Sequence, residues 1–226
     1  MKGLSEILKN TESAKVISND IDYADYVPLS LSVNNEEITK QKIETAKDYE
    51  HYIQKYLEKS NAKIAYGGYK EHRNLYQRST VFKNQDNDER NIHIGLDLWI
   101  NESAPVYAAL DGTIHSFLNN DALGDYGPTI ILKHQIEHFA FHTLYGHLSM
   151  DSLDGKKTGT FVKKGQQIAT LGMPPINGDY APHLHFQIII DIENKVGDYP
   201  GVCNQNRLAF YLENCPDPDL LLKIKT

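Results

Sequence analysis

Apolar and polar side chains alternate most clearly over residues 181–190, which read Ala-Pro-His-Leu-His-Phe and continue as Gln-Ile-Ile-Ile. The apolar and β-branched content of this run predicts a buried strand. Because successive side chains on a strand face opposite sides, His183 and His185 share one face and Leu184 points to the other. Two imidazoles at the start of a strand indicate a metal or proton-transfer site, or alternatively a pair of partly exposed, hydrogen-bonded histidines.

A second alternating run covers residues 91–100. His93 and Asp97 are four residues apart, an even offset, so on an extended segment both point the same way. The opposite face of that segment would carry Ile92, Ile94, Leu96 and Leu98.

Short strands separated by turn signals make up most of the remaining middle of the chain. The strands over 106–109 and 113–117 flank the turn at Asp111 and Gly112 as one predicted pair, and those over 129–134 and 139–145 form the next pair. This spacing predicts a mainly β fold with a core of antiparallel strands. The predicted strands cover residues 106–109, 113–117, 129–134, 139–145 and 165–172.

The N-terminal part has a different pattern, with its clearest helix over residues 36–59. Asn35 can cap this helix, and Glu36 and Glu37 are favourably placed against the helix dipole. Apolar side chains recur at three- and four-residue steps, which predicts a stripe that packs on the main domain or, alternatively, forms a dimerisation surface. The stripe consists of Ile38, Ile43, Ala46, Tyr49, Ile53, Tyr56 and Leu57.

These patterns divide the chain into three parts. Residues 1–65 form an N-terminal extension with one long helix, preceded by a short helix over 4–8. Residues 66–200 form the β domain. Residues 201–226 form a C-terminal tail packed on the core, in which 206–212 and 219–223 are expected to be helical.

Composition narrows the function classes. The 226 residues carry a net charge of −7 and a pI near 5.8, which argues against nucleic acid or an anionic membrane as the main partner. No apolar run is long enough for a membrane span. Residues 1–10 include acid and amide side chains where a signal peptide needs an apolar core, so we expect a cytoplasmic protein. Reduced thiols at Cys203 and Cys215 agree with that compartment, although a disulfide between them stays open.

The candidate chemistry comes from His93, Asp97 and His185. A buried carboxylate beside imidazoles is costly unless it is paired or bound to a cation. Two nitrogens and one oxygen leave a fourth position for water, which is typical of catalytic zinc, whereas structural zinc is usually closed by four ligands. The two cysteines lack metal-site spacing, so a structural zinc finger is not expected.

His93-x-x-x-Asp97, followed about ninety residues later by His183-x-His185, resembles the signature of the lysostaphin-type (LytM-like) zinc metallopeptidases. A Tyr-x-His element of that family is similar to Tyr145-Gly-His147 here, and the resemblance covers residues 90–191.

The resemblance implies a gapped antiparallel two-sheet β-sandwich with one zinc ion in an open groove. It implies that His93, Asp97 and His185 hold the ion. It also implies that His147 and His183 flank the ion without ligating it and act as general acid and base.

The resulting function hypothesis is a zinc-dependent endopeptidase in a cytoplasmic variant of that family. Its substrate would be a small or cell-wall-derived peptide, because no export signal is visible to bring it to intact wall. A peptidase-like zinc-binding regulatory or binding module without turnover is the alternative. The stretches 106–117 and 161–172 also resemble biotinyl and lipoyl carrier domains, but no Met-Lys-type pair stands in a turn between them.

The remaining polar residues are assigned more simply. We expect His51 and His72 to be surface residues, His115, His134 and His138 to be structural, and His142 to lie outside the site. Relatives in the resembled family often have an oxyanion-stabilising tyrosine upstream of the first ligand. Spacing does not choose between Tyr69 and Tyr76, so neither is assigned, and the substrate-binding residues stay unknown.

Overall fold

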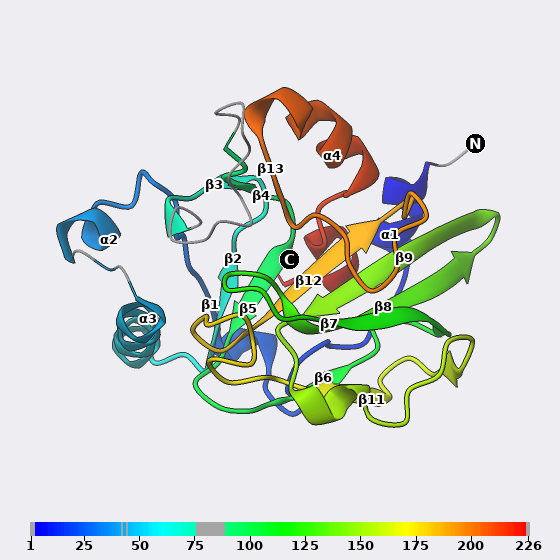
Figure 1. The fold of residues 1–226 in the computed structure, drawn as a ribbon, viewed down its shortest axis with the longest axis horizontal. Coiled ribbons are helices and arrows are strands. Elements are labelled where there is room, and N and C mark those ends of the chain that lie inside the picture. The colour runs from blue at the N-terminus through cyan, green and yellow to red at the C-terminus, as the bar shows by residue number, and fades with distance from the viewer. Residues whose placement is uncertain (1–2, 42, 44, 76–88, 225–226) are drawn as a thin grey trace.

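The computed structural model describes residues 3–41, 43, 45–75 and 89–224 (Figure 1). Its centre is an eight-stranded sheet, so the prediction of a mainly β fold is confirmed. In spatial order the strands are β1 (Tyr26–Pro28), β2 (Ile64–Gly67), β5 (Leu96–Trp99), β12 (His183–Ile189), β9 (Phe139–Gly146), β8 (Gly127–Ile136), β7 (Gly112–Asn120) and β10 (Phe161–Val162).

Two smaller sheets accompany this large sheet in the described part of the chain. Most strand pairs are antiparallel, but β1 and β2 at the edge of the large sheet run parallel, so the purely antiparallel prediction was wrong there. Three sheets also differ from the predicted two-sheet sandwich. The small sheets are β11 (Gln167–Thr170) with β6 (Pro105–Tyr107), and β13 (Val202–Cys203) with β4 (Ile92–His93) and β3 (Glu71–His72).

The helices lie at the two ends of the chain. Short 3-10 turns, η1 (Tyr23–Asp25), η3 (Met150–Leu153) and η4 (Gln205–Arg207), join the strands and helices. The α-helices are α1 (Leu4–Asn10), α2 (Glu36–Gln41), α3 (Ala46–Ser60), α4 (Leu208–Asn214) and α5 (Asp219–Leu222).

The helix predicted over residues 36–59 is divided into α2 and α3. Asn35 caps α2 as predicted, because its side chain accepts a hydrogen bond from the Glu37 N–H at 3.0 Å. A second helix then begins at a capping box, in which Thr45 and Asp48 each accept a bond from the other's backbone N–H. Capping boxes mark helix starts, so this pair defines a new N-terminus inside the predicted helix.

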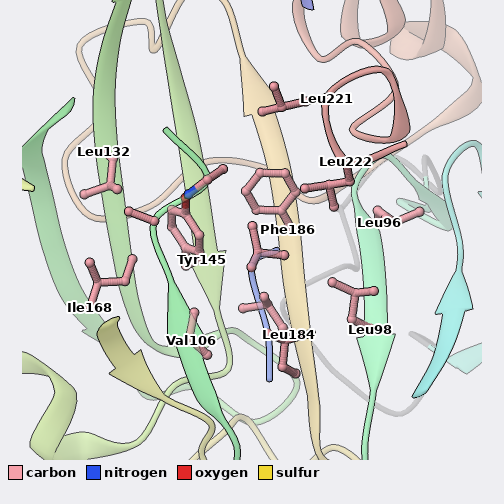
Figure 2. Close-up of a cluster of buried hydrophobic side chains, with 14 of the residues drawn as sticks. Leu96, Leu98, Val106, Leu132, Tyr145, Ile168, Leu184, Phe186, Leu221 and Leu222 are labelled. Atoms are coloured by element: carbon pink, nitrogen blue, oxygen red, sulfur yellow. The ribbon is translucent and has the colours of Figure 1, made fainter. Parts of the chain in front are cut away.

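One face of the large sheet carries the main hydrophobic core (Figure 2). Side chains of β5, β8, β9 and β12 meet those of the small sheet β6–β11 and of α5 there. The labelled members are Leu96, Leu98, Val106, Leu132, Tyr145, Ile168, Leu184, Phe186, Leu221 and Leu222. Leu184 therefore faces away from His183 and His185, as strand alternation predicts.

The opposite face of the large sheet is covered in two parts. The small sheet β3–β4–β13 and α4 enclose a second cluster that includes Ile94, Leu144 and Tyr199. Helix α3 encloses a third cluster with Ala65 and Trp99, so the prediction that its apolar stripe packs on the main domain is confirmed.

The run 91–100 is not one strand. Its first part, β4, belongs to the small sheet, and its second part, β5, belongs to the large one. Ile92 and Ile94 accordingly lie in a different cluster from Leu96 and Leu98, so the prediction of one shared apolar face was wrong. The chain changes sheets around Gly95, and the two polar side chains of the run come from different sheets.

The predicted pairing around Asp111 and Gly112 was also wrong. The strands on either side belong to different sheets, since β6 pairs with β11 and β7 pairs with β8 and β10. The strands predicted over 129–134 and 139–145 do pair, as β8 and β9.

We expect Leu221→Ala to lower the free energy of unfolding by about 2–5 kcal/mol, the usual cost of truncating a fully buried leucine. Leu221 is completely buried in the main core, whereas its neighbour Leu220 packs only partly against it. Leu220→Ala is therefore the matched control and should cost less. Urea denaturation measures both; equal losses would contradict the docking of the C-terminal tail in the core.

Candidate metal centre

Three polar side chains from β4, β5 and β12 converge on one point. His93 Nε2 lies 2.9 Å from His185 Nδ1, and Asp97 Oδ1 lies 3.3 Å from the first atom and 3.2 Å from the second. Donors bound tetrahedrally to zinc at 2.0–2.2 Å stand about 3.3 Å apart. The spacing therefore fits one small divalent cation held by all three atoms.

The other polar atom of each imidazole has its own partner. His93 Nδ1 is 2.9 Å from the carbonyl oxygen of Gly68, to which it can donate. His185 Nε2 is 2.9 Å from Oε1 of Gln187, whose amide nitrogen is directed to the Pro200 carbonyl instead. These bonds place the ring protons on the outer nitrogens and leave the inner nitrogens as electron-pair donors.

The outer oxygen of Asp97 also has its own partner, the guanidinium cation of Arg73. Its Oδ2 accepts a hydrogen bond from Arg73 Nη1 at 2.7 Å, while Arg73 Nε binds Glu71 at 2.6 Å. The Arg73 guanidinium also lies over the Trp99 ring, 5.7 Å from its centroid. The second carboxylate oxygen of Asp97 is thereby fixed toward the two imidazoles.

The three donor residues are almost completely buried, so their polar atoms need a partner within the protein. His93, Asp97 and His185 are only 2%, 1% and 2% exposed. Burial lowers the pKa of His93 to about 4, so its imidazole is neutral. Burial alone would raise the pKa of Asp97, but His93 and Arg73 hold it well below its usual range. A carboxylate and two electron-pair donors facing one another away from water call for a shared cation.

Glycine is required where the chain passes between the two sheets. A Cβ at Gly95 would lie 2.3 Å from Cε1 of His185, closer than real contacts allow. Gly68, whose carbonyl faces His93, has a φ of +99°, which favours glycine. Both positions let the backbone approach the donor set closely.

The two remaining predicted histidines lie beside the donors. His183 Nε2 is 3.8 Å from Asp97 Oδ1, and the rings of His147 and His183 are 4.2 Å apart. Each Nδ1 is 2.8 Å from a backbone carbonyl, that of Asn177 for His147 and that of Ala181 for His183. Their Nε2 atoms are thus the ones left to exchange a proton.

Burial keeps both of these rings neutral. It lowers the pKa of His147 well below its usual value, and the nearby His183 and His185 lower it further. Burial also lowers the pKa of His183, although the charge of Asp97 opposes the shift. Neutral imidazoles are able to accept a proton.

Aromatic rings surround this pair of histidines. Trp99 stacks on His183 with ring centroids 5.9 Å apart, and Tyr180 meets the His147 ring edge-on at 5.1 Å. Tyr126 lies 5.0 Å from the His185 ring. Together with the donors, these side chains border a cleft of about 140 Å³.

The structure thus brings together all five predicted polar residues, which are His93, Asp97, His147, His183 and His185. Of the two tyrosines considered for oxyanion stabilisation, Tyr69 and Tyr76, the structure describes only the first. The Tyr69 hydroxyl donates to the Cys215 carbonyl in the tail at 2.8 Å rather than lining the cleft. Tyr76 lies outside the described residues.

The other histidines lie mostly as predicted, but His138, which was predicted to be structural, is exposed. His51, His72 and His138 are exposed, and His115 is partly buried. His142 is buried against the ring of His115, outside the cleft. Cys203 and Cys215 are buried free thiols.

Sequence reasoning did not assign Gln187, Trp99 or Arg73 to the site. Gln187 and Trp99 each follow a candidate ligand by two residues on the same strand, so strand alternation could have found them. Arg73 carries no such signal. Nothing in its local sequence shows that it reaches a carboxylate 24 residues away.

Residues 91–196, less than half of the chain, match the model of peptidase family M23. All five predicted polar residues lie in this segment. An uncharacterized metalloprotease of Haemophilus influenzae is 34% identical over 99 residues, which make up 44% of this chain but only 19% of that relative. The family match and this relative support a hydrolase of the metallopeptidase class.

Solved structures show a more limited similarity. The catalytic domain of the antimicrobial peptidase lysostaphin from Staphylococcus simulans is 28% identical, covering 54% of this chain and 80% of that one, with a TM-score of 0.37. The catalytic domain of the prophage-encoded M23 protein EnpA from Enterococcus faecalis is 18% identical, covering 55% and 85%, with a TM-score of 0.39. Both TM-scores are too low to establish a common overall fold.

No helix in the described part of the chain combines the length and the apolar character that a membrane span requires.

Arg73→Met should weaken divalent metal binding by about 10–100-fold, the usual effect of removing a partner that orients a ligand. The three donors stay in place, but Asp97 loses the bond that fixes its outer oxygen. Chelator competition measures the affinity, with circular dichroism to verify folding. Arg207→Met is the control, because Arg207 lies over Phe210 and Tyr211, away from the donors. Equal affinities in both variants would contradict this role.

His134 generates a pH prediction outside the centre. It is buried between the Asp111 carbonyl and the Thr143 hydroxyl, and burial lowers its pKa to about 4. Between pH 6.5 and 4 the unfolded chain therefore binds the extra proton, so stability falls as the pH decreases.

Between pH 7 and pH 5 this histidine should account for about 2 kcal/mol of lost stability. In His134→Gln that part of the loss should disappear. Urea denaturation of both proteins in excess chelator, which removes any contribution from metal binding, measures it. Identical pH dependence in the two proteins would show that His134 is not the group that titrates.

Proposed function

We propose that this protein is a zinc-dependent endopeptidase that hydrolyses a bond in a small or cell-wall-derived peptide. The observation that carries the proposal is the set of three donor atoms 2.9–3.3 Å apart, each with its other polar atom already engaged. His93, Asp97 and His185 would hold one zinc ion and leave a position open toward the cleft. The mixed nitrogen and oxygen donor set suits zinc.

Zinc bound there would supply Lewis acidity, lowering the pKa of water towards about 7 and polarising a peptide carbonyl. The protein side chains supply the proton transfers. Nε2 of His147 or His183 accepts the proton of the attacking water, because each Nδ1 is already bonded to a carbonyl. The protonated ring then delivers a proton to the leaving amine.

The aromatic lining of the cleft favours a peptide substrate over a highly charged polymer. Aromatic faces of Trp99, Tyr126 and Tyr180 border the histidines. We infer a cytoplasmic location and a free or recycled peptide as substrate.

The alternative is a binding or regulatory module that holds zinc without turnover. Its donors would look the same, but it would have no need for two additional histidines whose Nδ1 atoms are fixed by carbonyls, with Nε2 of His183 lying 3.8 Å from Asp97 Oδ1. That juxtaposition favours the enzyme.

His147→Ala and His183→Ala should each lower kcat by about 10²–10⁴-fold, the usual contribution of general acid–base catalysis, while still binding zinc. His93→Ala, Asp97→Ala and His185→Ala should instead lose the metal. Elemental analysis after dialysis gives the zinc content. Cleavage of wall-derived and glycine-rich peptides, followed by mass spectrometry, gives the activity.

Two results would count against these roles. Loss of zinc from His147→Ala would move that residue into the ligand set. A zinc-replete wild-type protein that cleaves none of the peptides, and behaves like His183→Ala with all of them, would favour the binding module.

A further inference from the structure

Part of the cleft lining comes from outside the family-matching segment. Leu31, Ala46, Tyr49 and Ile53 form one wall of the cleft, and all four lie in the N-terminal part of the chain, before residue 91. All four are apolar or aromatic, and all are buried. A feature built outside the matched segment belongs to this chain rather than to the shared catalytic core.

Strand register places this wall next to the candidate centre. Trp99 pairs with Ala65 on one side and with His183 on the other, so the three form one row across the large sheet. The next row contains Asp97 paired with His185. Rows that are two residues apart on a strand face the same side of a sheet. The apolar row and the donor row therefore share one face.

Helix α3 covers the outer end of the apolar row. Tyr49, Ile53 and Leu57 project from successive turns of α3 into the cluster that contains Ala65 and Trp99. Trp99 also stacks on His183, so a single indole connects the helix-covered cluster with the catalytic pair. Burial of its apolar face holds α3 against the large sheet at this position.

The cleft leaves space between this wall and the donors. The cleft has a volume of about 140 Å³. It is lined on one side by Ala46 and Ile53 of α3 and on the other by His93, Asp97 and His185. An apolar pocket beside a few convergent polar groups is the usual form of a ligand site. A substrate whose carbonyl approaches a metal ion held by the donors would extend a neighbouring side chain along this wall.

We propose that the wall formed by α3, Leu31 and Trp99 is a subsite for a hydrophobic side chain of the substrate, adjacent to the cleaved bond. The inference rests on the proposed function, because it assumes that a metal ion held by the donors would bind the substrate's carbonyl. It assigns specificity to peptides with a leucine-like residue at this position over peptides with glycine there.

Amino-acid hydroxamates test the subsite without turnover, since the hydroxamate binds the metal while the side chain probes the wall. Isothermal titration of the zinc-loaded full chain should show leucine hydroxamate binding at least tenfold more tightly than glycine hydroxamate. That ratio is about 1.4 kcal/mol and is modest for burying an aliphatic side chain.

Three variants locate the effect. Ala46→Leu fills the cleft and should remove the preference by weakening the binding of leucine hydroxamate. Ile53→Ala widens the cleft and should shift the preference from leucine towards phenylalanine hydroxamate. Leu57→Ala is the matched control, because Leu57 is equally buried on the same helix but does not line the cleft. It should lower the melting temperature and keep the wild-type preference.

The outcomes separate this inference from the proposed function. Equal binding of leucine and glycine hydroxamates, together with retained peptide cleavage, would overturn the subsite and leave the peptidase intact. A leucine preference that Ala46→Leu abolishes and Leu57→Ala preserves would support the subsite even if no peptide were cleaved. A preference that all three variants abolish would overturn it, since a general loss of packing would then explain the result.

Discussion

The pairing of Asp97 with Arg73 is the interaction on which the candidate centre depends. A carboxylate that is 1% exposed is costly unless a cation is near, and Arg73 provides one at 2.7 Å. The pair fixes the outer oxygen of Asp97 and directs the inner oxygen to His93 and His185. Gly68 and Gln187 orient the two imidazoles in the same manner. The donor geometry is therefore set by the protein before any ion arrives, which reduces the ordering that binding would require.

Much of the fold follows from local rules, and the exceptions have physical causes. Alternation correctly divided the faces of the strand that carries His183 and His185, because both of its neighbours keep it extended. The same rule failed over residues 91–100, because the chain leaves one sheet and joins another there. Apolar side chains can pack against either sheet equally well, so the apolar pattern does not reveal where the chain passes from one sheet to the other. The helix break at Thr45 was similarly hidden, since apolar spacing continues across it. Arg73 could not be assigned because its carboxylate partner is distant in sequence.

The matched segment and the rest of the chain contribute differently to the cleft. The segment supplies the five polar side chains, and these could be predicted because their order and spacing are recognisable. The N-terminal extension supplies apolar surface, which carries no comparable motif. An amphipathic stripe indicates that a helix packs on something but not on what. Only the coordinates show that α3 covers the row beside His183. Under the two proposals made above, the choice of substrate and the reaction chemistry would thus have separate structural origins.

The passage of the chain between two sheets has a mechanical consequence. His93 belongs to the small sheet β3–β4–β13, while Asp97 and His185 belong to the large one. An ion held by all three would cross-link the two layers at the point where the small sheet begins. Gln187 extends the same connection to the tail through its contacts with Pro200 and the Cys215 thiol. Binding of one metal ion at this buried position would then stabilise the packing of three separate chain segments, so their stability would depend on the concentration of free metal.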